Sequence, residues 1–80
     1  MENKITDFKY YPNPVENILN IESNSIISNL EVYNLNGQLL FESKYSDSKI
    51  GIDFKRYAAG VYLIVLTKDD KKESFKVIKK

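Results

Sequence analysis

Residues 57–66 read YAAGVYLIVL, and this stretch decides how the rest of the chain is interpreted. From Val61 to Leu66 every residue is apolar or aromatic, and most are of types that favour strands. Periodicity alone cannot separate a buried strand from a buried helix in so short a run. The length of the run, its β-branched residues and the preceding Gly60 favour a strand. We therefore predict that residues 61–67 form the central strand of the core, covered on both faces.

The segments on either side of this strand alternate apolar and polar residues, which is typical of half-buried strands. The predicted strands are residues 5–11, 15–22, 26–35, 38–44, 50–53, 61–67 and 73–79. The predicted loops are residues 23–25, 45–49 and 68–72, and residues 54–60 form a connection with room for one helical or 3₁₀ turn. About seven short strands without a convincing helix predict an all-β domain, an immunoglobulin-like antiparallel β-sandwich. A small barrel is the alternative.

The alternation also predicts which side chains face the core. They are Val15, Leu19, Ile21, Leu30, Val32, Leu39, Phe41, Ile50, Ile52, Phe75 and Val77.

Glycine and proline mark the turns. Pro12 and Pro14 fix their own φ angles and extend the residues before them, so residues 11–14 predict a rigid turn. The pair Asn36-Gly37 predicts a β-hairpin over residues 30–44, because both residue types tolerate a positive φ. After Gly60, the hydroxyl of Tyr62 is expected to bond back to the upstream backbone, as in the tyrosine corner of sandwiches.

The composition excludes several kinds of chemistry. The 80 residues carry a formal net charge of +1 and include neither Cys nor His. A nearly neutral chain is not drawn strongly to nucleic acid or to a membrane surface. Without Cys and His, the chain lacks thiolate nucleophiles, disulfides, the usual general base and the common zinc ligands. The acidic residues show no calcium-loop spacing. We expect no catalytic residue, metal site, cofactor or nucleic-acid partner.

Two sequence features allow both a functional and a structural interpretation. The C-terminal lysines could form a docking patch, or they could protect an edge strand from unwanted pairing. They are Lys71, Lys72, Lys76, Lys79 and Lys80. Six Tyr residues could provide a platform on which sugars stack, although Tyr also suits half-buried strands and most of the six are expected to be structural.

Three groups of residues, taken in order, resemble one known family. They are residues 11–15 (YPNPV) with 19–21 (LNI), residues 32–40 (VYNLNGQLL), and residues 59–65 (AGVYLIV) with 76–80 (KVIKK). At this spacing they are similar to the type A C-terminal sorting domain of the type IX (Por) secretion system of Bacteroidetes. The resemblance covers the chain from about residue 5 to its end, as a single domain over residues 1–80 in which residues 1–4 form a linker.

The resemblance implies a seven-stranded sandwich at the C-terminus of a larger cargo protein. That cargo would enter the periplasm by its own signal peptide, none being visible here, and the outer-membrane translocon would then read the domain. In the family, a sortase-type cysteine endopeptidase typically removes the domain, and the cargo ends at the cell surface or is secreted. The domain would be the substrate of these steps and not an enzyme.

The family's signature positions carry over to particular residues of this chain. The recognition candidates are Tyr11, Pro12, Asn13, Pro14, Lys76, Lys79 and Lys80, and the structural signature positions are Gly37, Gly60 and Tyr62. An accessory binding module, holding a glycan or a neighbouring catalytic domain and retained in the mature protein, is the alternative function.

Overall fold

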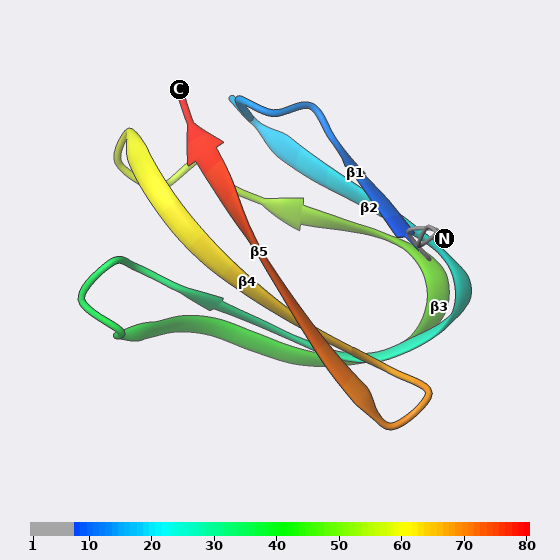
Figure 1. The fold of residues 1–80 in the computed structure, drawn as a ribbon. Coiled ribbons are helices and arrows are strands. Elements are labelled where there is room, and N and C mark those ends of the chain that lie inside the picture. Colours follow the sequence, from blue (N-terminus) through cyan, green and yellow to red (C-terminus); the bar gives the residue numbers. More distant parts are fainter. Residues whose placement is uncertain (1–7) are drawn as a thin grey trace, which may run out of the picture.

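The computed structural model describes residues 8–80, which form one antiparallel sheet of five strands (Figure 1). The strands are β1 (Phe8–Tyr11), β2 (Ile18–Tyr33), β3 (Leu39–Asp53), β4 (Gly60–Lys68) and β5 (Lys71–Lys79). No helix occurs within this described part, so the all-β prediction is confirmed. The predicted start of the first strand, residues 5–7, lies outside the described residues.

The long strand β2 holds the sheet together because it has three partners. Along one edge it pairs with β3 over almost its whole length. Along the other edge its first half pairs with β1 and its second half pairs with β4. β5 then pairs with β4, which gives the order β1-β2-β4-β5 with β3 beside β2.

The predicted loops at residues 23–25 and 45–49 are wrong, because both stretches lie inside the continuous strands β2 and β3. The register between these two strands shifts between Glu22 and Ile27, which marks an irregularity of the ladder. Such irregularities bend a strand and increase its twist. Both strands turn sharply here, and the sheet curls back over itself (Figure 1).

Because of this bend, the seven strands of the predicted sandwich are in fact five. The predicted strands 15–22 and 26–35 fall largely within β2, and 38–44 and 50–53 largely within β3. The observed fold is therefore a five-stranded sheet curled into a half-barrel. Polar residues at the bend suggested chain breaks, but their backbone stays in the strands.

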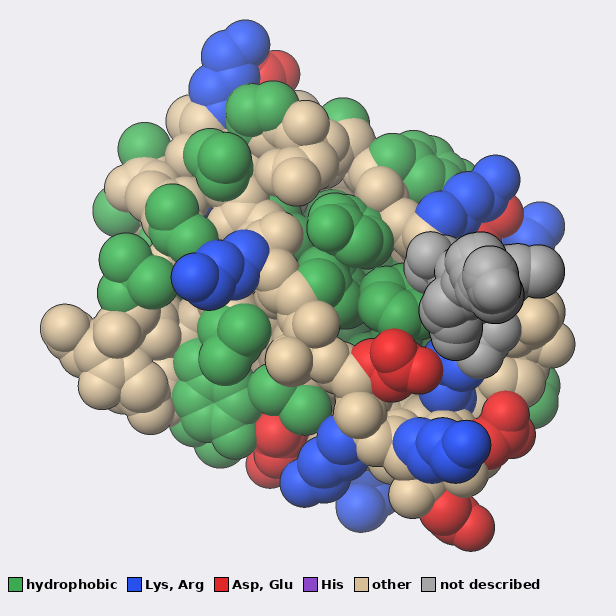
Figure 2. Space-filling model, viewed as in Figure 1, with side chains coloured by type: hydrophobic (Ala, Val, Ile, Leu, Met, Phe, Trp, Pro, Cys, Tyr) green, Lys and Arg blue, Asp and Glu red, His purple; other side chains and the backbone are tan. Residues whose placement is uncertain are grey.

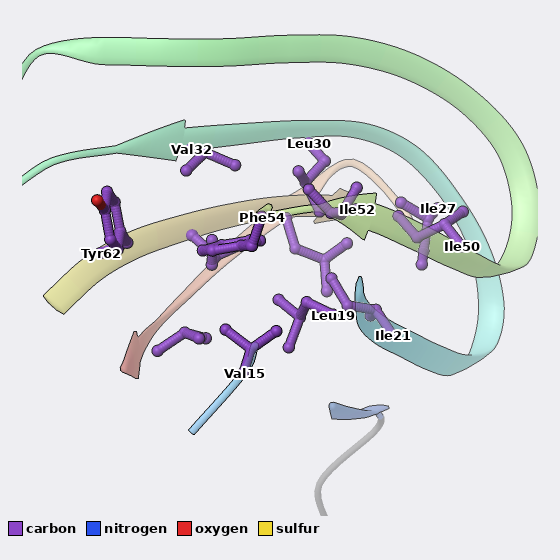
Figure 3. Packing of buried hydrophobic residues seen from close by; sticks show 13 residues of the cluster. Val15, Leu19, Ile21, Ile27, Leu30, Val32, Ile50, Ile52, Phe54 and Tyr62 are labelled. Carbon is purple, nitrogen blue, oxygen red and sulfur yellow. The ribbon is translucent and has the colours of Figure 1, made fainter. Parts of the chain in front are cut away.

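The inner face of the curled sheet encloses one hydrophobic core (Figure 3). Its members are Val15, Leu19, Ile21, Ile27, Leu30, Val32, Ile50, Ile52, Phe54, Tyr62, Ile64, Leu66 and Val77. Eight of the eleven residues predicted to face inward are among them, and Phe41 and Phe75 pack partly buried against the cluster. The prediction is wrong for Leu39, which is exposed next to the β2–β3 turn. Elsewhere the period-two pattern gave the core face correctly even where it misplaced the strand ends.

Strand β4 does lie inside the sheet, between β2 and β5, but only one of its faces is fully covered. Ile64 and Leu66 are completely buried, whereas the intervening Leu63 and Val65 are half-buried on the outer face. The prediction of a strand covered on both faces is therefore wrong. An outer face of Val and Leu looks like a buried strand in sequence, although here it is partly open to solvent.

The predicted hairpin at Asn36-Gly37 is confirmed, with a different turn geometry. The N–H of Gly37 bonds to the carbonyl of Asn34 at 3.0 Å, and the N–H of Asn34 bonds to the carbonyl of Gln38 at 3.1 Å. Only Gly37, with φ of 83°, is left-handed in this turn. This is the three-residue loop that ends in a glycine, and not the two-residue loop with two positive φ angles.

The other two connections are also turns. Asp69 and Asp70 have φ of 51° and 62° and make the tight β4–β5 turn at the centre of the predicted charged loop 68–72. Between β3 and β4, the N–H of Tyr57 bonds to the carbonyl of Phe54 at 3.0 Å in a single turn. Of the two turns considered for residues 54–60, the α-helical one does not form, and the bond joins residues three apart, as in a single 3₁₀ turn.

Candidate functional site

The turn between β1 and β2 lies against the C-terminal end of β5 (Figure 1). We call the contact between residues 11–16 and residues 78–80 the terminal junction. It brings Pro12, Asn13 and Pro14 close to the end of β5, where two of the C-terminal lysines lie, Lys79 and Lys80. These groups are more than sixty residues apart in sequence.

Backbone hydrogen bonds hold the junction together. Val15 lies beside Lys79 in a short parallel bridge. The N–H of Val15 donates to the carbonyl of Ile78 at 2.8 Å, and the N–H of Lys80 donates to the carbonyl of Val15 at 2.9 Å. Because the Val15 side chain is completely buried, this residue fixes the turn to the core as well as to β5.

Asn13 adds a side-chain bond to the same edge. Its Oδ1 accepts a hydrogen bond from the N–H of Ile78 at 3.0 Å. Asn13 stands between two prolines, and both the Tyr11–Pro12 and the Asn13–Pro14 peptide bonds are cis. The N–H and the carbonyl of Ile78 are thus both occupied by the turn, on the side of β5 that faces away from β4.

The exposed rim of the junction carries charge. The Lys80 ammonium lies 3.6 Å from the Glu16 carboxylate, and both side chains are more than half exposed. An exposed ion pair of this kind contributes little to stability. Pro12, Pro14, Glu16, Ile18 and Lys80 line a shallow open hollow with Asn17. This rim can offer a partner prolines, a carboxylate and an ammonium together, outside the folded core.

Tyr11 is held by the neighbouring strand β2. Its hydroxyl donates a short hydrogen bond to the Glu22 carboxylate, and Asn20 Nδ2 donates to the Tyr11 carbonyl at 3.3 Å. The bond from Tyr11 lowers the pKa of the Glu22 carboxyl below its ordinary value of 4.5, and it raises the pKa of the Tyr11 hydroxyl above 10.0. Tyr11 therefore stays neutral beside an ionised Glu22 near pH 7.

The C-terminal lysines do not gather into one patch. Lys80 lies on the junction rim, and the partly buried Lys79 donates through Nζ to the carbonyl of Lys80 at 3.4 Å. Lys76 lies elsewhere, on the outer face of β5 opposite Phe75 and Val77. The recognition candidates thus divide into a junction group and a separate Lys76.

Of the structural signature positions, Gly60 lies opposite Lys79 in the β4–β5 ladder, whereas Gly37 and Tyr62 lie outside the terminal junction. Gly37 supplies the left-handed residue of the β2–β3 turn, and Gly60 begins β4 with φ of 156°. The Tyr62 hydroxyl donates to the carbonyl of Ala58 at 2.6 Å, as expected for a tyrosine corner. Its ring stacks on Tyr57 at a centroid distance of 5.3 Å and meets Phe54 edge to face.

The described residues do not provide a sugar-stacking platform. Between residues 8 and 80, Tyr11 is the single aromatic side chain among the large exposed hydrophobics. Six of the other aromatic residues pack in two clusters, one around Phe75 and one around Phe54. Phe41 and Tyr45 pack singly against the core, and the half-buried Tyr33 bonds to Glu31.

Acidic groups and membrane helices add no further site. Over the same residues no group of three or more acidic side chains is placed to hold a metal ion. Nor does any helix of this part of the chain have the length and apolarity to cross a membrane.

Three contributors to the junction were not recognised from sequence: Val15 as a pairing residue, Glu16 and Ile78. Val15 was predicted to be buried, but nothing in local periodicity indicates a parallel bridge to a strand sixty residues later. Asn13 is the one sequence feature that could have indicated this contact, because it places a short polar side chain between two prolines in a rigid turn.

Comparison with known proteins agrees with this geometry. The family described as secretion system C-terminal sorting domain matches residues 9–80, which includes both halves of the terminal junction. No curated protein matches the chain. The resemblance to type IX sorting domains is confirmed by this match, which implies export to the cell surface or the medium. The chain belongs to the family of secretion system C-terminal sorting domains and carries a sorting signal for type IX secretion.

Proposed function

We propose that the terminal junction is the part of this domain that the outer-membrane translocon reads. The domain would act as a folded export signal on a larger cargo, which reaches the periplasm by its own signal peptide. A sortase-type cysteine endopeptidase would then remove the domain, so that the cargo is released or stays at the cell surface. The domain itself would be the substrate of these steps and would catalyse none of them.

One observation carries this proposal: the proline turn and the last two lysines, Lys79 and Lys80, meet only in the folded chain. A partner that contacts Pro12, Pro14 and Lys80 together would recognise the folded domain and ignore an unfolded tail. Affinity at such a site would come from the turn and the ammonium groups, because the rest of the rim is shallow and open.

Point variants test the junction better than truncation does. Deleting residues 74–80 would also remove Val77 from the core and Phe75 from its packing, at a cost of several kcal/mol (about 2–5 for each large core side chain). The variant Lys79→Ala/Lys80→Ala leaves these two side chains in place. Surface substitutions of this kind usually change stability by less than about 0.5 kcal/mol.

The experiment measures export of a reporter that carries residues 1–80 at its C-terminus and a signal peptide at its N-terminus. Lys79→Ala/Lys80→Ala should reduce surface or secreted reporter several-fold, whereas the matched control Lys55→Ala/Arg56→Ala, on the exposed β3–β4 connection, should not. Lys76→Ala is scored separately, because Lys76 lies away from the junction. Export that is unchanged in the junction variant would exclude these lysines as recognition groups.

The mass of the mature cargo separates the sorting signal from the alternative, an accessory binding module. Loss of the domain's 9.3 kDa from the exported protein is expected of a removable signal. A retained domain would favour the binding module. The lack of an exposed aromatic platform in residues 8–80 gives that alternative no support for glycan binding.

A further inference from the structure

Strand β5 has an open backbone edge between Lys72 and Lys76, next to the terminal junction but distinct from it. Successive residues of an antiparallel strand direct their N–H and carbonyl groups alternately to its two sides. Ile78 shows which residues direct these groups away from β4, because its own N–H bonds to Asn13 and its carbonyl bonds to Val15 on that side. Ser74 and Lys76, four and two residues earlier, therefore direct their backbone groups to this same side.

Nothing among residues 8–80 occupies this stretch of the edge. β5 pairs along its other side with β4, and on the open side the described residues form one pairing, the bridge at Lys79. The edge has three outward-directed residues before the junction begins, at Lys72, Ser74 and Lys76. This is enough for a short added strand, and the junction sets where that strand must stop.

The side chains above this edge are positively charged. Lys72 and Lys76 are four residues apart, so both project from the outer face of β5. Within the described chain neither ammonium has an acidic partner in an ion pair. A second copy of β5 would bring like charges together, so this edge resists self-pairing and favours a strand with acidic side chains.

Below the edge lie Glu73, whose carboxylate is 3.8 Å from the Lys68 ammonium, and the apolar Phe75. Phe75 projects to the inner face, where its ring lies 4.1 Å from Tyr10 and 5.2 Å from Phe8 by ring centroids. All three are only partly buried. Figure 2 shows hydrophobic side chains in a hollow beside the course of β5. A strand added here would place every second side chain next to these rings.

We propose that the edge of β5 from Lys72 to Lys76 binds an extended polypeptide segment in which acidic and apolar residues alternate. The segment would add a strand to the sheet, with its acidic side chains beside Lys72 and Lys76 and its apolar side chains beside Phe75. Main-chain hydrogen bonds to Ser74 and Lys76 supply affinity. The lysines on the outer face and Phe75 on the inner face supply specificity. This site goes beyond the sorting role and is independent of the terminal junction.

The test uses the 80-residue chain and a short synthetic peptide in which valine and glutamate alternate. Binding is measured by calorimetry, and amide hydrogen exchange locates it. The amides of Ser74 and Lys76 should become protected, and the amide of Ile78, already bonded to Asn13, should not change. A peptide in which lysine replaces glutamate should bind roughly tenfold more weakly.

Two variants separate the charges from the backbone. Lys72→Glu/Lys76→Glu should reverse the preference, so that the lysine peptide binds better than the glutamate peptide. Ser74→Pro keeps both lysines and removes one outward N–H, and it should weaken both peptides without breaking a bond to β4. Lys55→Glu/Arg56→Glu is the charge-matched control. Circular dichroism confirms that each variant is folded.

Three outcomes would overturn the proposal. The two peptides could bind equally well or not at all to the unmodified chain. Protection could appear away from Ser74 and Lys76. Sedimentation could show that the chain alone forms dimers which Lys72→Glu/Lys76→Glu alters, which would assign the edge to a second copy. If the unmodified chain does not bind the glutamate peptide but the reporter is exported normally, only the proposal for the β5 edge is refuted. If the peptide binds as predicted but Lys79→Ala/Lys80→Ala does not change export, only the proposal for the junction is refuted.

Discussion

At the scale of single residues, a few polar contacts fix the geometry that the hydrophobic pattern leaves open. The hydroxyl of Tyr62 closes the β3–β4 connection, and Asn13 ties a proline-rich turn to the last strand. The first contact was predictable, because it lies within four residues of sequence. The second joins residues 13 and 78, and no local pattern could have indicated it.

Replacing Tyr62 with Phe tests the corner bond. The variant keeps the ring in its cluster but leaves the Ala58 carbonyl without its 2.6 Å partner. We expect a loss of about 1–2 kcal/mol in the free energy of unfolding, measured with urea. Tyr33→Phe is the control, because the Tyr33 hydroxyl bonds only to the nearby Glu31 carboxylate and its loss should cost less. Equal losses in the two variants would contradict a special role for the corner.

The Tyr11–Glu22 bond should make part of the stability depend on pH. The pKa of Glu22 is lowered by this bond, so its contribution is present above pH 4.5 and is lost as the pH falls through the folded-state pKa. The pKa of Tyr11 is raised, so its contribution is present below pH 10.0 and is lost as the pH rises through the folded-state pKa.

The free energy of unfolding of Tyr11→Phe should therefore differ most from that of the unmodified chain between pH 4.5 and pH 10.0. In a carboxyl titration followed by nuclear magnetic resonance, the pKa of Glu22 in the variant should rise toward 4.5. A Glu22 pKa that does not move would mean that the hydrogen bond is absent in solution.

At the scale of elements, the sequence predicts the faces of strands better than their ends. The side chains of Leu19, Ile21, Leu30 and Val32 face the core as predicted. Residues 23–25 and 45–49 were predicted as loops because they are polar. In a curled sheet, however, polar residues can occupy a bend where the pairing is irregular while their backbone continues the strand, so polarity indicates exposure and not a chain break.

The β2–β3 turn depends on Gly37. An added Cβ would meet no atom within 4 Å, so the φ of 83° alone makes Gly37→Ala unfavourable. We expect a loss of about 1 kcal/mol in unfolding free energy. Gly37→Asn should cost less, because Asn tolerates the left-handed region. If the two variants were equally stable, backbone strain would not be the cause.

The contact between the proline turn and β5 can be measured at one amide. Asn13→Ala removes the acceptor of the Ile78 N–H, so hydrogen exchange at Ile78 should accelerate. The amide of Val77 points toward β4 and serves as the internal control, with little change expected. Unchanged exchange at Ile78 would mean that Asn13 does not hold the strand end.

At the scale of the whole molecule, a small curled sheet brings distant surface groups together. The fold class and the family could be predicted from sequence, since both depend on periodicity and ordered motifs. The number of strands could not be predicted from sequence, because it depends on how β2 and β3 bend. The junction could not either, because the contact of residues 11–16 with residues 78–80 exists only after the sheet has curled.

The most direct test of the account is export of the reporter carrying residues 1–80 in two strains. One strain has a working type IX system, and its sister lacks the translocon. We predict that the reporter reaches the surface or the medium only in the first strain and stays in the periplasm of the second. Equal retention in both strains, with the domain folded, would contradict a sorting role for this chain.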